Sequence, residues 1–183
     1  MLPDSKIIHV LRDAQDTVAS LIEVNKSSRG KGGGSVLWAP ESARGCARLW
    51  VDHVRAAREA AKNLQNNQFC EVRYEHLKSS PETELLKLSH FLSWDWDKES
   101  INDAIRLNDP ELAREAGTAT GIPVAGEFQR ISGITFSGTH TYARKAKVGS
   151  WREDLTLKQK LGIWLVARKT MNEAAYRWKY PWQ

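Results

Sequence analysis

Hydrophobic and polar positions follow two different patterns near the start of the chain. The run Lys6–Leu11 is short, mostly apolar and β-branched, which predicts a buried strand. The apolar positions that follow recur at helical spacing and predict a helix over 14–26. Asp13 can cap that helix. We therefore expect Arg12 at the carboxyl end of the strand, beside a helix N-terminus.

The same two patterns return along the rest of the chain. Phe69–Tyr74 reads as a second strand, and because helical segments separate it from the first, the two strands should be parallel. Ser42 and Ser80 can each cap a helix, with Pro81 at the first helical position. Helices are predicted over about 43–66, 81–92, 98–116 and 157–178. The apolar face of the last one is predicted at Leu161, Trp164, Leu165, Met171, Ala175 and Trp178. This order predicts an α/β fold with few parallel strands flanked by helices.

Two segments lack either periodicity. The Gly-rich stretch over 27–41 follows a helix and lacks the spacing of a phosphate-binding loop, so we expect a flexible loop. Residues 117–143 are rich in Gly, Thr and Ser, which is typical of a long loop that acts as a lid or binds an acceptor. We expect one partial domain over 1–183.

Composition changes this picture only modestly. The net charge is +5, and the segment 144–183 holds ten Lys and Arg against three Asp and Glu. Such a tail suits nucleic acid, an anionic membrane surface or an anionic cofactor, and a solvated helix face is the plain alternative. No apolar run approaches the ~20 residues of a membrane span. The first residues lack the layout of a signal peptide, so we expect a cytoplasmic protein.

The cysteine and tryptophan content adds little chemistry. Cys46 and Cys70 form no metal-binding pattern, and we expect two buried, reduced thiols and no metal. The chain has eight tryptophans, which could serve base stacking, but most fall on helical apolar stripes. Trp50 in particular is predicted to lie in the core.

Candidate binding residues cluster where the predicted strands end. Open α/β sheets bind ligands at this edge, and helix N-termini attract anions. Arg12 adds a cation with paired donors suited to a phosphate, and Ser20 offers a hydroxyl about two turns into the helix. Tyr74 stands at the carboxyl end of the second predicted strand, on the same edge. The simpler alternatives are an ion-pairing surface arginine and an aromatic side chain packed in the core.

Three stretches carry a resemblance to a known family. They are Arg-Asp-x-x-Asp-x-x-x-Ser over 12–20, Val-Arg-Tyr-Glu-His-Leu over 72–77, and Arg-Lys-Ala-Lys-Val-Gly-Ser-Trp-Arg over 144–152. Together they resemble the motifs of sulfotransferases that use 3′-phosphoadenosine 5′-phosphosulfate (PAPS). The resemblance implies that Tyr74 contacts the adenine. It implies 3′-phosphate contacts from Arg12, Ser20, Arg144, Lys145 and the backbone N–H of Ala146. Ala146 replaces a glycine of the family pattern, which could restrict close backbone approach.

The resemblance implies sulfuryl transfer from PAPS to a hydroxyl or amine of a small-molecule, carbohydrate or peptide acceptor. These residues hold no counterpart of the family's 5′-phosphosulfate loop or its histidine base. We therefore expect the C-terminal portion of a P-loop-like sulfotransferase fold, by truncation or true loss, with no catalytic residue assigned and little activity alone. The alternatives are a catalytically inactive module that binds PAPS or its product adenosine 3′,5′-bisphosphate (PAP), and, less favoured, a basic nucleic-acid-binding protein. A homodimer is also considered.

Overall fold

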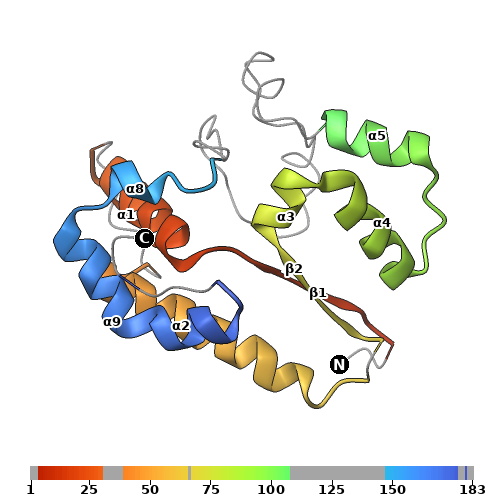
Figure 1. Cartoon of the computed structure of the whole chain (residues 1–183). Coiled ribbons are helices and arrows are strands. Elements are labelled where there is room, and N and C mark those ends of the chain that lie inside the picture. The colour runs from red at the N-terminus through yellow and green to blue at the C-terminus, as the bar shows by residue number, and fades with distance from the viewer. Residues whose placement is uncertain (1–3, 31–38, 66, 108–146, 177–179, 181–183) are drawn as a thin grey trace. The chain divides into compact units, whose positions relative to one another are not determined.

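The computed structural model describes residues 4–30, 39–65, 67–107, 147–176 and 180. The chain divides into two compact units, one formed by Met1–Ser79 with Val148–Gln183 and the other by Ser80–Lys147. The first unit contains β1 (Ile7–Leu11), α1 (Ala14–Gly30), α2 (Ala43–Ala61), β2 (Phe69–Arg73), α3 (Tyr74–Ser79), α8 (Trp151–Asp154) and α9 (Leu157–Glu173) (Figure 1). The second contains α4 (Pro81–Leu92) and α5 (Lys98–Leu107).

The strands β1 and β2 pair in parallel, as the sequence predicts, and the register runs from Ile7 opposite Phe69 to Leu11 opposite Arg73. Arg12 and Tyr74 are therefore the first residues beyond two adjacent strand ends. The expectation that β1 is buried is wrong for most of it: Ile7, Ile8 and Val10 are exposed, and only Leu11 lies in the core. Most of β1 stays exposed because the core helices of this unit pack only around its carboxyl end, at Leu11.

Helix α1 begins as predicted. The Asp13 carboxylate accepts the backbone N–H groups of Gln15 at 2.6 Å and Asp16 at 3.3 Å, which satisfies two donors of the first turn. The helix continues to Gly30, so the loop predicted from 27 onward is wrong for residues 27–30. Serine disfavours a helix only mildly, so Ser27 and Ser28 remain in α1. Residues 31–38 of that loop lie outside the described residues.

Helix α2 carries the largest part of the core. Ser42 caps it as predicted, accepting the N–H of Gly45 at 3.0 Å, but the helix ends at Ala61 rather than near 66. Its buried face is formed by Cys46, Ala47, Trp50, Val51 and Val54. These side chains join a core cluster with residues of α1 and α9. Figure 1 shows these two helices beside α2. Trp50 therefore lies in the core, as predicted.

Helix α9 buries only part of the predicted face: Met171 is buried and Trp164 packs against the core as predicted, but most of the buried residues lie on a neighbouring stripe. Its buried residues are Gly162, Ile163, Ala167, Thr170 and Met171. Leu161 and Leu165 are about half exposed, at 48% and 50%, so their assignment to the core is wrong. The small residues explain the choice of face, because they let a neighbour approach closely: a Cβ on Gly162 would lie 3.1 Å from Cγ of Arg44 on α2.

The end of α9 also differs from the prediction. The helix stops at Glu173 rather than near 178, because Ala175 takes a left-handed conformation with φ of 59°. Ala175 is exposed rather than on the buried face, and Trp178 lies outside the described residues. At the other end, Thr156 and Gln159 form a capping box.

The second unit is organised by the link between its two helices. Pro81 stands at the start of α4 as predicted, but Ser80 makes no side-chain capping bond. Ser93 ends α4 with φ of 60°, and the Ser89 hydroxyl donates to the carbonyl of Trp94 at 2.7 Å. Residues 108–146, which include the rest of the helix predicted over 98–116 and the loop predicted over 117–143, lie outside the described residues.

Cys46 is buried as predicted, but the prediction that Cys70 is buried is wrong, because Cys70 is only partly buried; both are free thiols. Burial raises the pKa of the Cys46 thiol, which favours the inert, protonated form. Among the helices of the described part, none has the length and apolar character needed to cross a bilayer.

Candidate functional site

The site predicted from the first motif is the turn between β1 and α1. Arg12 is the first residue after the strand, and its backbone carbonyl accepts the indole N–H of Trp50 at 3.0 Å. Trp50 is only 7% exposed, so this bond joins the turn to the core. The indole therefore has a second role that sequence reasoning missed: it fixes the backbone that carries Arg12.

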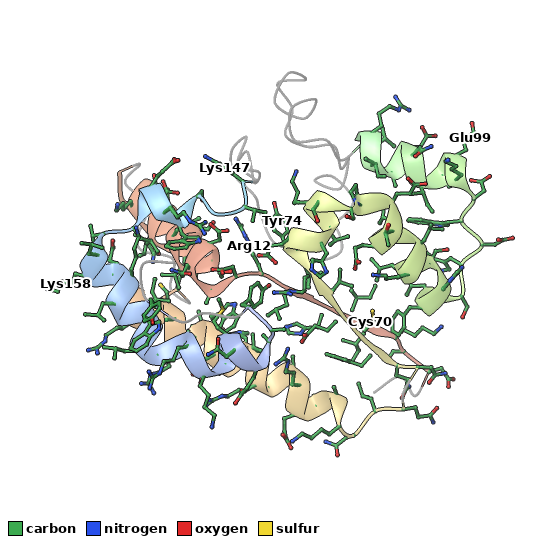
Figure 2. The ribbon with its side chains drawn as sticks, in the orientation of Figure 1. Arg12, Cys70, Tyr74, Glu99, Lys147 and Lys158 are labelled. Carbon is green, nitrogen blue, oxygen red and sulfur yellow. The ribbon has the colours of Figure 1, made fainter. Side chains whose placement is uncertain are left out.

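Arg12 and Tyr74, predicted from separate motifs, are in contact. The guanidinium carbon of Arg12 lies 4.6 Å from the centre of the Tyr74 ring, at the ends of β1 and β2 (Figure 2). One guanidinium nitrogen, Nη2, lies 4.0 Å from Oδ2 of Asp16. The Arg12 side chain keeps 26% of its surface exposed, so a ligand in solvent can reach it. A stacked, partly exposed cation with several donors suits an anionic ligand.

Asp16 ties the first motif to the last one. Its Oδ2 accepts the N–H of Gly149 at 2.7 Å, while Oδ1 accepts the N–H of Trp151 at 3.1 Å and the hydroxyl of Ser150 at 3.4 Å. The Asp16 side chain is 1% exposed, and these donors compensate its buried charge. The Gly-Ser-Trp segment, which leads into α8, is thereby held on α1 one turn from Arg12.

Gly149 must adopt an unusual backbone conformation to make this contact. Its φ is +81°, in the region that glycine enters at no steric cost. A Cβ here would lie 2.7 Å from the Nη1 atom of Arg152, which is the end of a flexible side chain. The spacing of glycine and tryptophan that supports the family resemblance therefore has a local physical cause.

A group of three acids surrounds the turn. Asp13, Asp16 and Glu75 interact, and burial raises the pKa of Asp13 to about 6. The two backbone N–H groups that Asp13 accepts lower its pKa, while the charges of Asp16 and Glu75 raise it further. Asp13 is thus a carboxyl group that gains its proton near pH 6 beside the proposed ligand-binding arginine.

Sequence reasoning missed two members of this site. Glu75 accepts the backbone N–H of Asp13 at 2.9 Å, and the Tyr176 hydroxyl donates to Glu75 at 2.8 Å. Glu75 directly follows Tyr74, which was the available signal. Nothing in the sequence placed Tyr176 here, because it falls within the helix predicted over 157–178, whereas the helix ends at Glu173.

Of the other residues predicted to bind the 3′-phosphate, the structure describes only Ser20. Ser20 lies on α1 and is partly exposed. Arg144, Lys145 and Ala146 lie outside the described residues, immediately before the segment that Asp16 holds. Their contacts stay predictions. Within the described ranges, no group of His, Cys, Asp and Glu side chains could hold a metal ion.

Comparison with known proteins identifies the class of protein. Residues 1–98 match the model of the sulfotransferase family. Because this match covers more than half of the chain, the chain belongs to the sulfotransferase family. No curated protein sequence matches it.

Solved structures show the same fold. A crystal structure of mouse sulfotransferase SULT7A1 complexed with PAP aligns with a TM-score of 0.67 and 19% identity, covering 94% of this chain and 60% of that one. A crystal structure of retinol dehydratase with androsterone and the inactive cofactor PAP aligns with a TM-score of 0.58 and 17% identity, covering 96% of this chain and 49% of that one. The chain thus has the sulfotransferase fold and spans about 60% or less of these two relatives.

Proposed function

We propose that this chain binds the 3′-phosphoadenosine part of PAPS and PAP, and serves sulfuryl transfer to a hydroxyl or amine. Arg12 and Ser20 from the first motif, and Arg144, Lys145 and the Ala146 N–H from the last, are proposed to bind the 3′-phosphate. Tyr74 is proposed to contact the adenine. No metal is required for these contacts.

The bond between Asp16 and Gly149 carries this proposal. The proposed phosphate ligands come from two motifs more than 130 residues apart, so they can serve one phosphate only if the fold brings the motifs together. The Asp16 carboxylate accepts three hydrogen bonds from the last motif, and these join the two motifs within four residues of Arg12. The two aligned crystal structures, both described as PAP complexes, support the same ligand.

The geometry also suits a phosphate for an electrostatic reason. Arg12 is always charged and offers several donors in a fixed plane, while the N-terminus of α1 next to it carries the positive end of the helix dipole. Nearby acids would oppose a dianion, but Asp16 already accepts three hydrogen bonds, which compensate its charge. The 3′-phosphate distinguishes PAP from ordinary adenine nucleotides.

In the proposed reaction an acceptor oxygen or nitrogen attacks the sulfur of PAPS. The bond between sulfur and the bridging phosphate oxygen breaks, PAP leaves, and the acceptor's proton passes to a base. We assign no catalytic residue of this chain. His9 is a poor candidate for the base, since its ring lies in β1 and its Nδ1 is 3.2 Å from Oε2 of Glu71. The proposed acceptors are small molecules, carbohydrates or peptides.

Titration calorimetry of the full chain with PAP tests this proposal. Arg12→Ala should weaken binding by roughly ten- to a hundredfold, since a hydrogen bond to a charged group contributes about 1.5–3 kcal/mol. The affinity of Arg12→Lys should lie between those of the wild type and Arg12→Ala, because lysine keeps the charge but lacks the planar pair of donors. Arg55→Ala is the matched control: it removes an exposed arginine of α2. Equal affinities for PAP and adenosine 5′-monophosphate, or an Arg12→Ala variant that binds normally, would overturn the proposal.

The same preparation separates the alternatives. Incubation with labelled PAPS and an acceptor panel distinguishes transfer from binding without turnover, the result expected of an inactive module. Nucleic-acid binding would instead show an affinity that falls steeply with salt, with a slope set by the phosphates contacted. A cytoplasmic location remains part of the proposal, tested by fractionating cells that express the protein.

A further inference from the structure

The peptide group that follows Arg12 is held from both sides. Its carbonyl oxygen, on Arg12, accepts the Trp50 indole N–H at 3.0 Å. Its N–H, on Asp13, donates to Oε1 of Glu75 at 2.9 Å. One side chain comes from α2 and the other from α3, so the plane of this peptide is fixed relative to two separate helices. The orientation of that plane helps set the direction in which the Arg12 side chain leaves the backbone.

The Glu75 carboxylate is itself fixed by a third segment. Its Oε2 accepts the Tyr176 hydroxyl at 2.8 Å, and that hydroxyl also lies 3.4 Å from the carbonyl of Leu11 at the end of β1. The guanidinium of Arg73 lies 4.0 Å from the centre of the Tyr176 ring. Tyr176 follows α9, so one carboxylate joins the β1–α1 turn, the start of α3 and the chain after α9.

Tyr176 is protonated at neutral pH, because its pKa lies above the ordinary value of a phenol. Burial, followed by the negative charge of Glu75, raises the pKa of the Tyr176 phenol. The hydroxyl is therefore a dependable donor to Glu75. The residue that orients Glu75 is in turn held by Arg73, which ends β2.

We propose that Glu75, oriented by Tyr176, is a positioning residue that directs Arg12 toward the phosphate of the nucleotide. This inference rests on the proposed function, since Arg12 is its acting group. Glu75 does not itself meet the ligand, because its negative charge would repel a phosphate. It acts by fixing the peptide between Arg12 and Asp13, and a misdirected arginine loses affinity even when its charge is unchanged.

Three substitutions and one double variant test the role of Glu75, each measured by calorimetry with PAP well below the melting temperature. Glu75→Ala should weaken binding about tenfold, since it releases the peptide that aims a charged hydrogen-bond donor. Glu75→Gln should stay within about threefold of the wild type, since its carbonyl can accept the Asp13 N–H and its amide can donate to the Tyr176 oxygen. Tyr176→Phe should give an intermediate loss. The control is Glu59→Gln, which removes an exposed carboxylate of α2.

The double variant Arg12→Ala/Glu75→Ala separates positioning from a general structural effect. If Glu75 acts through Arg12, then Glu75→Ala costs no further affinity once Arg12 is absent. Additive losses, or unchanged affinity in Glu75→Ala and Tyr176→Phe, would overturn the inference while leaving the proposed function intact. If Glu75→Ala does not fold, the affinity for PAP is compared between Tyr176→Phe and the double variant Arg12→Ala/Tyr176→Phe. The inference then requires that Tyr176→Phe costs no further affinity once Arg12 is absent. A wild-type chain that does not bind PAP would overturn the proposed function, and this inference with it.

Discussion

Asp16 and Gly149 are joined by a hydrogen bond of 2.7 Å although 133 positions separate them in the sequence. The bond links the second acid of the first motif to the glycine of the last motif. The carboxylate also accepts the N–H of Trp151, so one buried side chain fixes the start of α8 on α1. The two motifs are therefore parts of one structure, and the conformation of either depends on the other.

Removing this carboxylate should destabilise the protein strongly. Asp16→Ala leaves the N–H groups of Gly149 and Trp151 without their acceptor, and each unsatisfied buried group costs about 1–3 kcal/mol. We expect a loss of about 2–5 kcal/mol in the free energy of unfolding, measured by urea denaturation. Asp52→Ala, which removes an exposed acid of α2, is the control and should change little. Equal urea midpoints for the two variants would contradict the importance of the Asp16 contacts.

Substitutions at Gly149 should rank by their tolerance of a positive φ. Gly149→Ala should cost about 1–2 kcal/mol of stability, because a Cβ clashes with the backbone in the left-handed region. Gly149→Asn should cost less, since asparagine enters this region more readily. The arginine end that a Cβ would meet can swing away, so it adds little. The order glycine, asparagine, alanine in thermal melts tests this, and an alanine variant as stable as the wild type would refute it.

The sequence predicted the part of the fold that local chemistry decides. The strand before Arg12 and the Asp13 cap follow from a β-branched run and a short acidic side chain, and both occur as expected. The parallel pairing with β2 follows from the helical segments between the strands. Arg12 and Tyr74 then meet because residues that follow neighbouring parallel strands share one sheet edge.

The rest depended on contacts between distant segments. Periodicity placed apolar residues along α9 but could not tell which of two adjacent stripes packs, a choice made by the close approach that Gly162 permits. Likewise, Asp16 lies in the first turn of α1, where an acid favours a helix by itself, and only the fold shows that it accepts the N–H of Trp151 at the start of α8. The position of Tyr176 could not be predicted either, because it depends on where α9 ends. The helix ends early because a single residue, Ala175, takes the left-handed conformation.

The exposed leucines of α9 give the homodimer prediction a specific form. Leu157, Leu161 and Leu165 recur every fourth position and are 73%, 48% and 50% exposed, so they form an apolar stripe on the surface. If two copies pair through this stripe, Leu161→Asp should shift the chain to monomer in sedimentation velocity without lowering its melting temperature. Glu173→Asp, a mild change on the same helix, is the control. A wild-type chain that sediments as a monomer at high concentration would refute the pairing.

Asp13 should make stability depend on pH between about 4 and 6. Its pKa is raised from 3.8 to about 6 in the folded protein, chiefly by burial, with the charges of Asp16 and Glu75 facing it. In this range the native state holds a proton that the unfolded chain has released, so the contribution of Asp13 to stability falls as pH rises toward 6 and is then constant. Above pH 6 the native state contains a charged carboxylate that it disfavours.

Asp13→Asn isolates this effect, because asparagine keeps an acceptor for the capping bonds but cannot ionise. We expect the variant to be more stable than the wild type by about 1–3 kcal/mol at pH 8, and equally stable near pH 4. The difference between the two chains, taken from urea denaturation at several pH values, removes the contribution of other groups. Glu71 is one such group: burial works to raise its pKa, but the hydrogen bond and charge of Arg58 lower it, so its contribution is lost in acid. Two results would contradict this prediction: a stability difference that does not change with pH, or an asparagine variant that is less stable than the wild type at pH 8. Either would show that ionisation of Asp13 does not destabilise the folded protein.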